Sequence, residues 1–212
     1  MDLLWTATPM LVPGKLPPEE LAGLLAATSF AAGLNVYATV ATLGLLSRAE
    51  LVALPPSLQM LASWYVIGIS GLLFVIEFFA DKVPAFDLIW NALHTFVRVP
   101  IAALLAFRAT AHLSPTDQLL AALAGGLIAL AAHGGKTAVR AAVTPSPEPL
   151  SNGFLSLGED IFAIFLTWFA TRHPYLAAAV VLWLLVIIVV VIRWVIRALR
   201  ALFRGAQRRI AA

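Results

Sequence analysis

Ionisable side chains gather in a few short segments of a sequence that is otherwise strongly apolar. The acidic members are Glu77, Asp81, Asp87, Glu148, Glu159 and Asp160. The basic members and histidines are Lys82, His94, Arg98, His133, Lys136 and Arg140. Carboxylates and imidazoles bind cations, relay protons or act as acid–base catalysts, whereas the bases balance charge or bind an anion. The acids outnumber the bases, so the group favours a cation or a proton unless acids and bases pair with one another.

One polar stripe precedes Pro100. Asp87, Asn91, His94 and Arg98 are spaced by four, three and four residues, which places them on one face of a helix. Such a helix either lies at the membrane interface or dips into the membrane with its polar face toward a cavity. The weakness of the apolar run around Pro100 favours the second arrangement.

A second stripe combines small and charged residues within 116–142. Gly126 and Ala129 permit close helix packing at one end, and His133, Lys136 and Arg140 continue the same face. The charged end is expected to meet whatever lines a cavity. The small-residue end also allows a homodimer.

Two further segments contain polar residues that lie apart from these stripes. Asn35 lies near the middle of an apolar run, so its amide must find partners inside a helical bundle, either as structural support or along a substrate path. Residues 144–153 hold three prolines together with Glu148 and Asn152. This segment is predicted to be extended rather than helical, and it is suited to a gate or a re-entrant filter.

Composition determines which elements position these groups. Apolar types make up 61% of the 212 residues and charged types only 12%, which excludes a soluble globule and a disordered chain. We predict an all-α, polytopic membrane helix bundle, since about 20 residues span a bilayer core. The expected spans are residues 20–46, 57–80, 86–111, 116–142, 155–171 and 174–192, with the third broken at Pro100.

Charge distribution predicts the orientation of these spans. Residues 1–19 are expected to lie at the interface, 20–192 to form the transmembrane domain, and 193–212 to form an Arg-rich cytoplasmic amphipathic tail on anionic lipid. Six spans would place both termini in the cytoplasm. Only Arg48, Arg108 and Arg172 of the 14 basic residues would then lie outside. This local basic excess indicates a membrane surface and not a nucleic-acid partner.

A weak internal repeat relates two helical hairpins. Residues 56–62 align with residues 115–121, and the same offset places Glu77 opposite Lys136 and Asp81 opposite Arg140. We therefore predict pseudo-repeated hairpins with charge pairing across their interface, an arrangement common in transporters.

Several motifs together resemble one family of bacterial membrane proteins. They are Gly33-Leu-Asn-Val-Tyr37, Glu77-x3-Asp-Lys-Val-Pro84, Asp87-x2-Trp90-x3-His-Thr95-x2-Arg98, His133-Gly-x-Lys136-x3-Arg140 and Ser146-Pro-Glu-Pro-x-Ser-Asn152. Their order resembles domain-of-unknown-function family 4126 over about residues 21–193. The resemblance implies an integral protein of the bacterial inner membrane and brings no established activity.

Three functions remain open at this point. The first is a small transporter or channel with an ionisable cavity near the cytoplasmic side, moving a cation or a proton-coupled solute. The second is a structural or assembly subunit of a membrane complex, and the third is a membrane-embedded enzyme acting on lipid or isoprenoid phosphate. No catalytic signature and no cysteine is present, and we expect no cofactor. A water-filled cavity favours transport, whereas a closed and fully paired polar core favours the subunit.

Overall fold

The structure is a computed structural model that describes residues 17–80, 84–143 and 149–210. The elements in chain order are α1 (Pro18–Leu34), α2 (Val36–Arg48), the 3-10 helix η2 (Pro56–Ala62), α3 (Trp64–Ala80), α4 (Pro84–Ala109), α5 (Pro115–Val143), α6 (Pro149–Arg172) and α7 (Pro174–Ile210). No strand occurs in these ranges. The predicted all-α class is confirmed.

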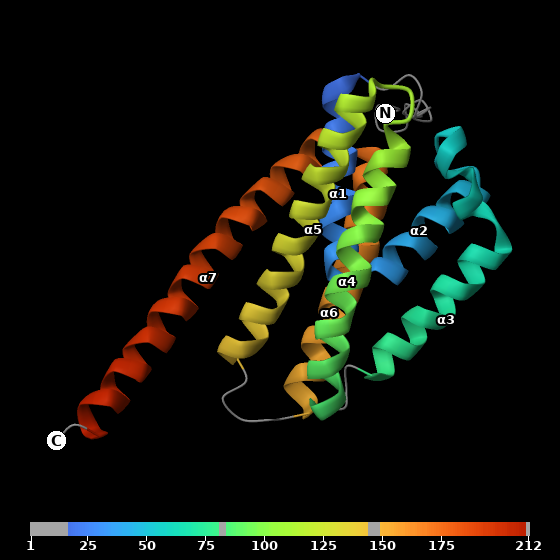
Figure 1. The fold of residues 1–212 in the computed structure, drawn as a ribbon. Coiled ribbons are helices and arrows are strands. Elements are labelled where there is room, and N and C mark those ends of the chain that lie inside the picture. The colour runs from blue at the N-terminus through green and yellow to red at the C-terminus, as the bar shows by residue number, and fades with distance from the viewer. Residues whose placement is uncertain (1–16, 81–83, 144–148, 211–212) are drawn as a thin grey trace, which may run out of the picture.

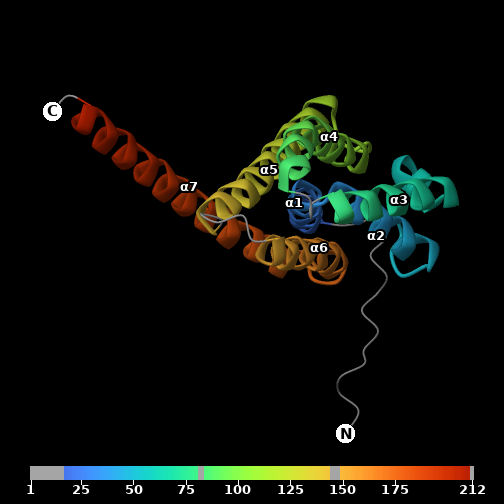
Figure 2. The same ribbon diagram turned by 90° about the horizontal axis from the view of Figure 1, so that it is seen from below.

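Helix α1 forms the centre of the bundle. It packs against α4, α5, α6 and α7, and Figure 2 shows it between the α4–α5 pair and α6. Small buried residues allow this close approach. A Cβ atom built on Gly33 would lie only 2.4 Å from the carbonyl oxygen of Ala129 on α5, so only glycine fits at this crossing.

The segment expected to form the first span is divided at Asn35. This residue is extended (φ −149°, ψ 103°) between α1 and α2, and its side-chain oxygen accepts a hydrogen bond from the Ala38 amide, as a helix N-cap does. Helix α2 then turns back (Figure 1), so that Leu25 of α1 and Leu43 of α2 pack in one apolar cluster. The expected continuous helix over residues 20–46 is therefore wrong.

Three described helical segments are long and apolar enough to cross a membrane, by length and composition. They are Pro115–Val139, Gly153–Arg172 and Pro174–Arg197. Helices η2 and α3 pass the same test only as a pair, and they are bent by 62° relative to each other. The six predicted spans are thus not all confirmed. The apolar helices suggest a membrane protein, and only 11% of the α7 window is buried inside the bundle.

Two expectations about prolines need correction. Helix α4 continues through Pro100, whose side chain is exposed, so the third segment is not broken there. Helix α6 begins at Pro149, because a proline in the first helical turn gives up an N–H that has no partner inside the helix. Residues 149–153 are consequently helical and not extended as predicted, whereas residues 144–148 lie outside the described residues.

Helix α7 is a single helix of 37 residues that extends beyond the other helices, as Figure 2 shows. The helix continues past residue 192 to Ile210; that this end forms a cytoplasmic amphipathic tail stays a prediction. The start of α1 lies beside the α6–α7 connection, where Gly23 meets Pro174, and the basic end of α7 lies at the opposite end of the bundle (Figure 1). The expected location of both termini on one side is not confirmed. The proposed interfacial segment lies almost entirely outside the described residues.

Candidate functional site

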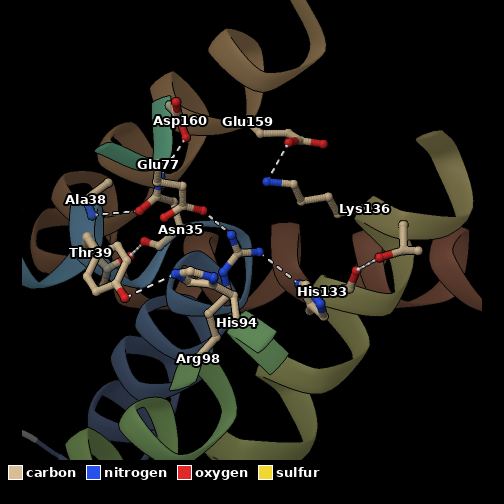
Figure 3. Close-up of polar contacts among 12 residues, drawn as sticks. Asn35, Ala38, Thr39, Glu77, His94, Arg98, His133, Lys136, Glu159 and Asp160 are labelled. Carbon is tan, nitrogen blue, oxygen red and sulfur yellow. Dashed lines mark hydrogen bonds and ion pairs between the residues drawn. The ribbon is translucent and has the colours of Figure 1, made fainter. Parts of the chain in front are cut away.

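A buried polar network surrounds the break between α1 and α2 (Figure 3). Asn35 is fully buried, and its Nδ2 atom donates to Oδ1 of Asp160 on α6 over 2.8 Å. The Thr39 hydroxyl donates to the Asn35 carbonyl oxygen over 2.9 Å. Asn35 therefore uses its amide to tie the break to α6, which confirms that it finds its partners inside the bundle.

The break also brings two helix ends together. Helix α1 ends at Leu34 and α2 begins at Val36, so the negative end of one helix dipole meets the positive end of the other. Backbone groups near such ends lack partners within their helix and require other polar groups or a ligand. The Asn35 side chain supplies one acceptor, and the surrounding ionisable residues make the region polar.

Arg98 of α4 joins α3 to α5. Its guanidinium forms an ion pair with Glu77 of α3 and contacts Nδ1 of His133 on α5 through Nη1, over 2.9 Å. Since an arginine only donates, Nδ1 accepts, and the proton of a neutral His133 ring is on Nε2. All three side chains are buried. Within the described part of the chain, Oε2 of Glu77 and Nε of Arg98 are buried without a hydrogen-bond partner, a condition that favours a water or a ligand there.

A second contact lies on the α2 side of Arg98. The hydroxyl of Tyr37 is 3.1 Å from Nε2 of His94, and the two rings meet edge to face with centroids 5.6 Å apart. His94 is buried and Tyr37 is half-buried. The stripe on α4 thus faces the bundle interior at His94 and Arg98, as the cavity-facing arrangement requires.

The margin of the network faces a cavity. Nζ of Lys136 on α5 lies 2.9 Å from Oε2 of Glu159 on α6, and Figure 3 shows this pair beside the Arg98 group. A cavity of about 380 Å³ opens beside the pair between α1, α5, α6 and α7. The adjacent acids Glu159 and Asp160 therefore face different surroundings, the cavity and the helix break.

A family model described as Domain of unknown function (DUF4126) matches residues 22–194, which is most of the chain. The chain belongs to this family. No curated protein and no solved structure matched it.

The fold places eight of the predicted site residues of this DUF4126 protein in the network or at its margin. They are Asn35, Glu77, His94, Arg98, His133, Lys136, Glu159 and Asp160. Asp81 and Glu148 lie outside the described residues. The structure gives the helical backbone of four others but not their side chains: Asp87, Asn91, Arg140 and Asn152.

Two features of the network differ from the expectations. Glu77 pairs with Arg98 and Lys136 with Glu159, so the predicted pairing of Glu77 with Lys136 across a pseudo-symmetric interface is wrong. Tyr37 was not predicted as a site residue, although it ends the motif Gly33-Leu-Asn-Val-Tyr37 two residues after Asn35.

The chemistry available to the network is that of hydrogen-bonded acids, bases and imidazoles. Within the described residues, no three His, Asp or Glu side chains are arranged to hold a metal ion. The contacts run from Tyr37 and His94 on one side to His133 on the other, with Arg98 and Glu77 between them. Such groups can bind a small ion or pass a proton.

Proposed function

We propose that this DUF4126 protein is a small secondary transporter of the bacterial inner membrane that moves a cation or a proton-coupled solute. The observation that carries the proposal is the broken helix pair α1–α2, whose break at Asn35 faces buried ionisable groups of α3, α4, α5 and α6. Discontinuous helices with polar side chains at the break are how many transporters build a site near the membrane centre. Irregular backbone is tolerated at that depth where protein or a polar cavity surrounds it.

The energetic cost of burying charged side chains supports a functional role for the network. Replacing a buried ion pair with well-packed apolar residues is often neutral or stabilising, so stability alone does not require Glu77 and Arg98. Ionisable residues inside membrane helices are costly, and they mark ion or proton pathways. A bundle this apolar would assemble more simply with leucine at both positions.

The groups have distinct roles in the proposed mechanism. Asp160 and Asn35 bind the coupling ion or proton at the break. Arg98 and Glu77 link this position to His133; the buried Nε–H of Arg98 donates to the ion's water or the solute, and the buried Oε2 of Glu77 accepts from it. Positive charge on the exposed residues Arg193 and Arg197 orients the far end of α7 toward the cytoplasm.

The test is transport by purified protein in liposomes. Currents on a solid-supported membrane, together with the signal of a pH-sensitive dye inside the vesicles, are recorded under proton, divalent-cation and phosphate gradients. We expect a response to one of these gradients and at least about a tenfold loss in Asp160→Asn, the effect of removing one charge-assisted contact. The matched control is Asp117→Asn, which changes an exposed acid at the start of α5. Folded protein that gives neither current nor pH change under any gradient contradicts the proposal.

A second candidate function is a structural or assembly subunit. The observation that favours it is the pairing of Arg98 with Glu77 and of Lys136 with Glu159, since paired charges can specify how helices pack. Under this alternative, Asp160→Asn lowers the amount of protein in the membrane in parallel with any loss of activity. Normal accumulation with lost transport separates transport from structure.

A further inference from the structure

The cavity between α1, α5, α6 and α7 is apolar except at one point. Its walls include Phe30 of α1, Phe154 and Phe162 of α6, and Leu184 of α7. Among the residues whose side chains the structure describes, the charged ones in its lining are Lys136 and Glu159, which form an ion pair. A volume of about 380 Å³ is within the range of small-molecule sites, roughly 300–1,000 Å³. This space accommodates a head group together with the adjoining part of one hydrocarbon chain, not a whole lipid.

The ion pair lies between two apolar parts of the cavity. Lys136 is three residues from Val139, where the apolar segment of α5 ends, or about 5 Å along the helix axis. On α6, Phe154 lines the cavity on one side of Glu159, and Phe162 lies one helical turn away on the other side. An amphiphile fits with its head group at the ion pair and its chain on the Phe162 side, away from the basic end of α7.

The wall of the cavity is open at Gly158. A Cβ atom built there would meet no other atom within 4 Å, although glycine in a helix interior costs stability relative to alanine. By contrast, a Cβ atom on Gly135 would lie 2.6 Å from Ile188, where α5 and α7 close the cavity. The surface of α6 at Gly158 therefore meets no packing partner among the described residues, and it leaves room for a ligand.

We infer that this cavity binds a zwitterionic aminophospholipid of the phosphatidylethanolamine class. The lipid ammonium donates to the partly exposed Glu159 carboxylate, the phosphate accepts from the Lys136 ammonium, which turns out of its buried position to meet it, and one acyl chain lies against Phe30 and Phe162. The argument is charge complementarity: an ion pair matches a head group that carries one charge of each sign. An anionic head group would oppose Glu159, and a choline head group has no N–H to donate.

The site also adjoins the central network. Leu34 lines the cavity and the next residue, Asn35, forms the break, while Glu159 lines the cavity and the next residue, Asp160, bonds to Asn35. On both α1 and α6, a residue that lines the lipid cavity is thus followed directly by a residue at the helix break. The binding inference is independent of transport, because lipid retention is measured without any gradient.

The experiment measures lipids retained by the purified full chain. The protein is equilibrated in detergent with equal amounts of phosphatidylethanolamine, phosphatidylcholine and phosphatidylglycerol of the same acyl composition, and the retained lipids are counted by native mass spectrometry. We expect phosphatidylethanolamine to be retained about tenfold over phosphatidylcholine, the effect of one charge-assisted hydrogen bond. Equal retention of the three lipids, or a preference for phosphatidylglycerol, overturns the inference.

Two variants locate the site. Gly158→Leu fills the cavity without a clash, and it is expected to abolish retention, whereas Gly68→Leu, at an equally open position on α3, is expected to retain lipid normally. Glu159→Gln is expected to bring phosphatidylethanolamine retention down to the phosphatidylcholine level, and it decides the question if Gly158→Leu does not fold. Unchanged selectivity in Glu159→Gln, or full retention in folded Gly158→Leu, overturns the inference.

Discussion

Two ion pairs of the same chemical type occupy different surroundings in this bundle. Glu77 and Arg98 have side-chain exposures of 1% and 0%, and they lie beside the α1–α2 break. Lys136 is buried to a similar degree, but its partner Glu159 is 15% exposed and borders a cavity. Almost none of the surface of the first pair, the enclosed pair, is exposed, whereas the second, the marginal pair, borders a cavity at its acidic end.

From this difference we expect the loss in free energy of unfolding caused by a mutation to depend more on the burial of both partners than on the number of charges. When one member of an enclosed pair is removed, the other is left as a buried charge without compensation. At the cavity margin, a charge that loses its partner can be solvated. The enclosed pair is therefore expected to be rigid and sensitive to substitution, and the marginal pair to be adaptable.

The largest loss of stability is expected when one member of the enclosed pair, Glu77 and Arg98, is replaced. Glu77→Leu leaves Arg98 buried beside a neutral His133, so the free energy of unfolding should fall by about 3–5 kcal/mol. The measurement is denaturant titration of the helical circular dichroism signal in mixed micelles. The double variant Glu77→Leu/Arg98→Leu is the control, and it should recover more than half of the loss. A fully stable single variant contradicts the comparison.

The second effect tests the close helix packing that encloses the first pair. Gly33→Ala places a methyl group 2.4 Å from the Ala129 carbonyl oxygen, so α1 and α5 must separate at a cost of about 1–3 kcal/mol. The same titration measures it. Gly71→Ala on α3 is the matched control, since a Cβ atom there meets nothing within 4 Å, and it should be stabilising by about 0.5–1 kcal/mol. Equal effects at the two glycines would show that the crossing is looser than described.

The third effect concerns the marginal pair. Lys136→Met should lower the free energy of unfolding by about 1–2 kcal/mol, because the exposed part of Glu159 can remain hydrated. A double-mutant cycle with Glu159→Gln gives the coupling energy of the pair. This energy should be smaller than the one obtained for Glu77 and Arg98. A larger value at the margin reverses the comparison.

The smallest effect is on the Tyr37–His94 contact. Tyr37→Phe removes one hydrogen bond of 3.1 Å while keeping the ring packing, so the expected loss is about 0.5–1.5 kcal/mol. Tyr65→Phe is the control at an 84% exposed position, where no change beyond about 0.5 kcal/mol is expected. If the two substitutions have the same effect, this contact does not contribute to stability.

Much of the helical architecture could be predicted from the sequence. The long apolar runs over residues 116–142 and 174–192 predicted α5 and α7, because this signal is local. The break at Asn35 could not be predicted in this way. A single asparagine in an apolar run also fits the polar face of a continuous helix, and the hydrogen bond of Asn35 goes to Asp160, 125 residues away.

The candidate site was predictable as a group but not as pairs. The helical stripes placed Arg98, His133 and Lys136 on inward faces, because such periodicity depends only on spacing along one helix. Which acid meets which base depends on how helices rotate and shift against one another. The predicted hairpin repeat matched Glu77 with Lys136 by position along the chain, but the two side chains bond to different helices.

The central position of α1 has a consequence for biogenesis. Helices α4, α5, α6 and α7, against which α1 packs, all follow it in the sequence. A ribosome makes α1 before any of them, at about 5–20 residues per second. Helix α1 therefore cannot reach its final surroundings until α7 has been made. Until α6 has been made, Asn35 has no Asp160 to bond with, and the newly made segment depends on the insertion machinery or on water to satisfy its amide.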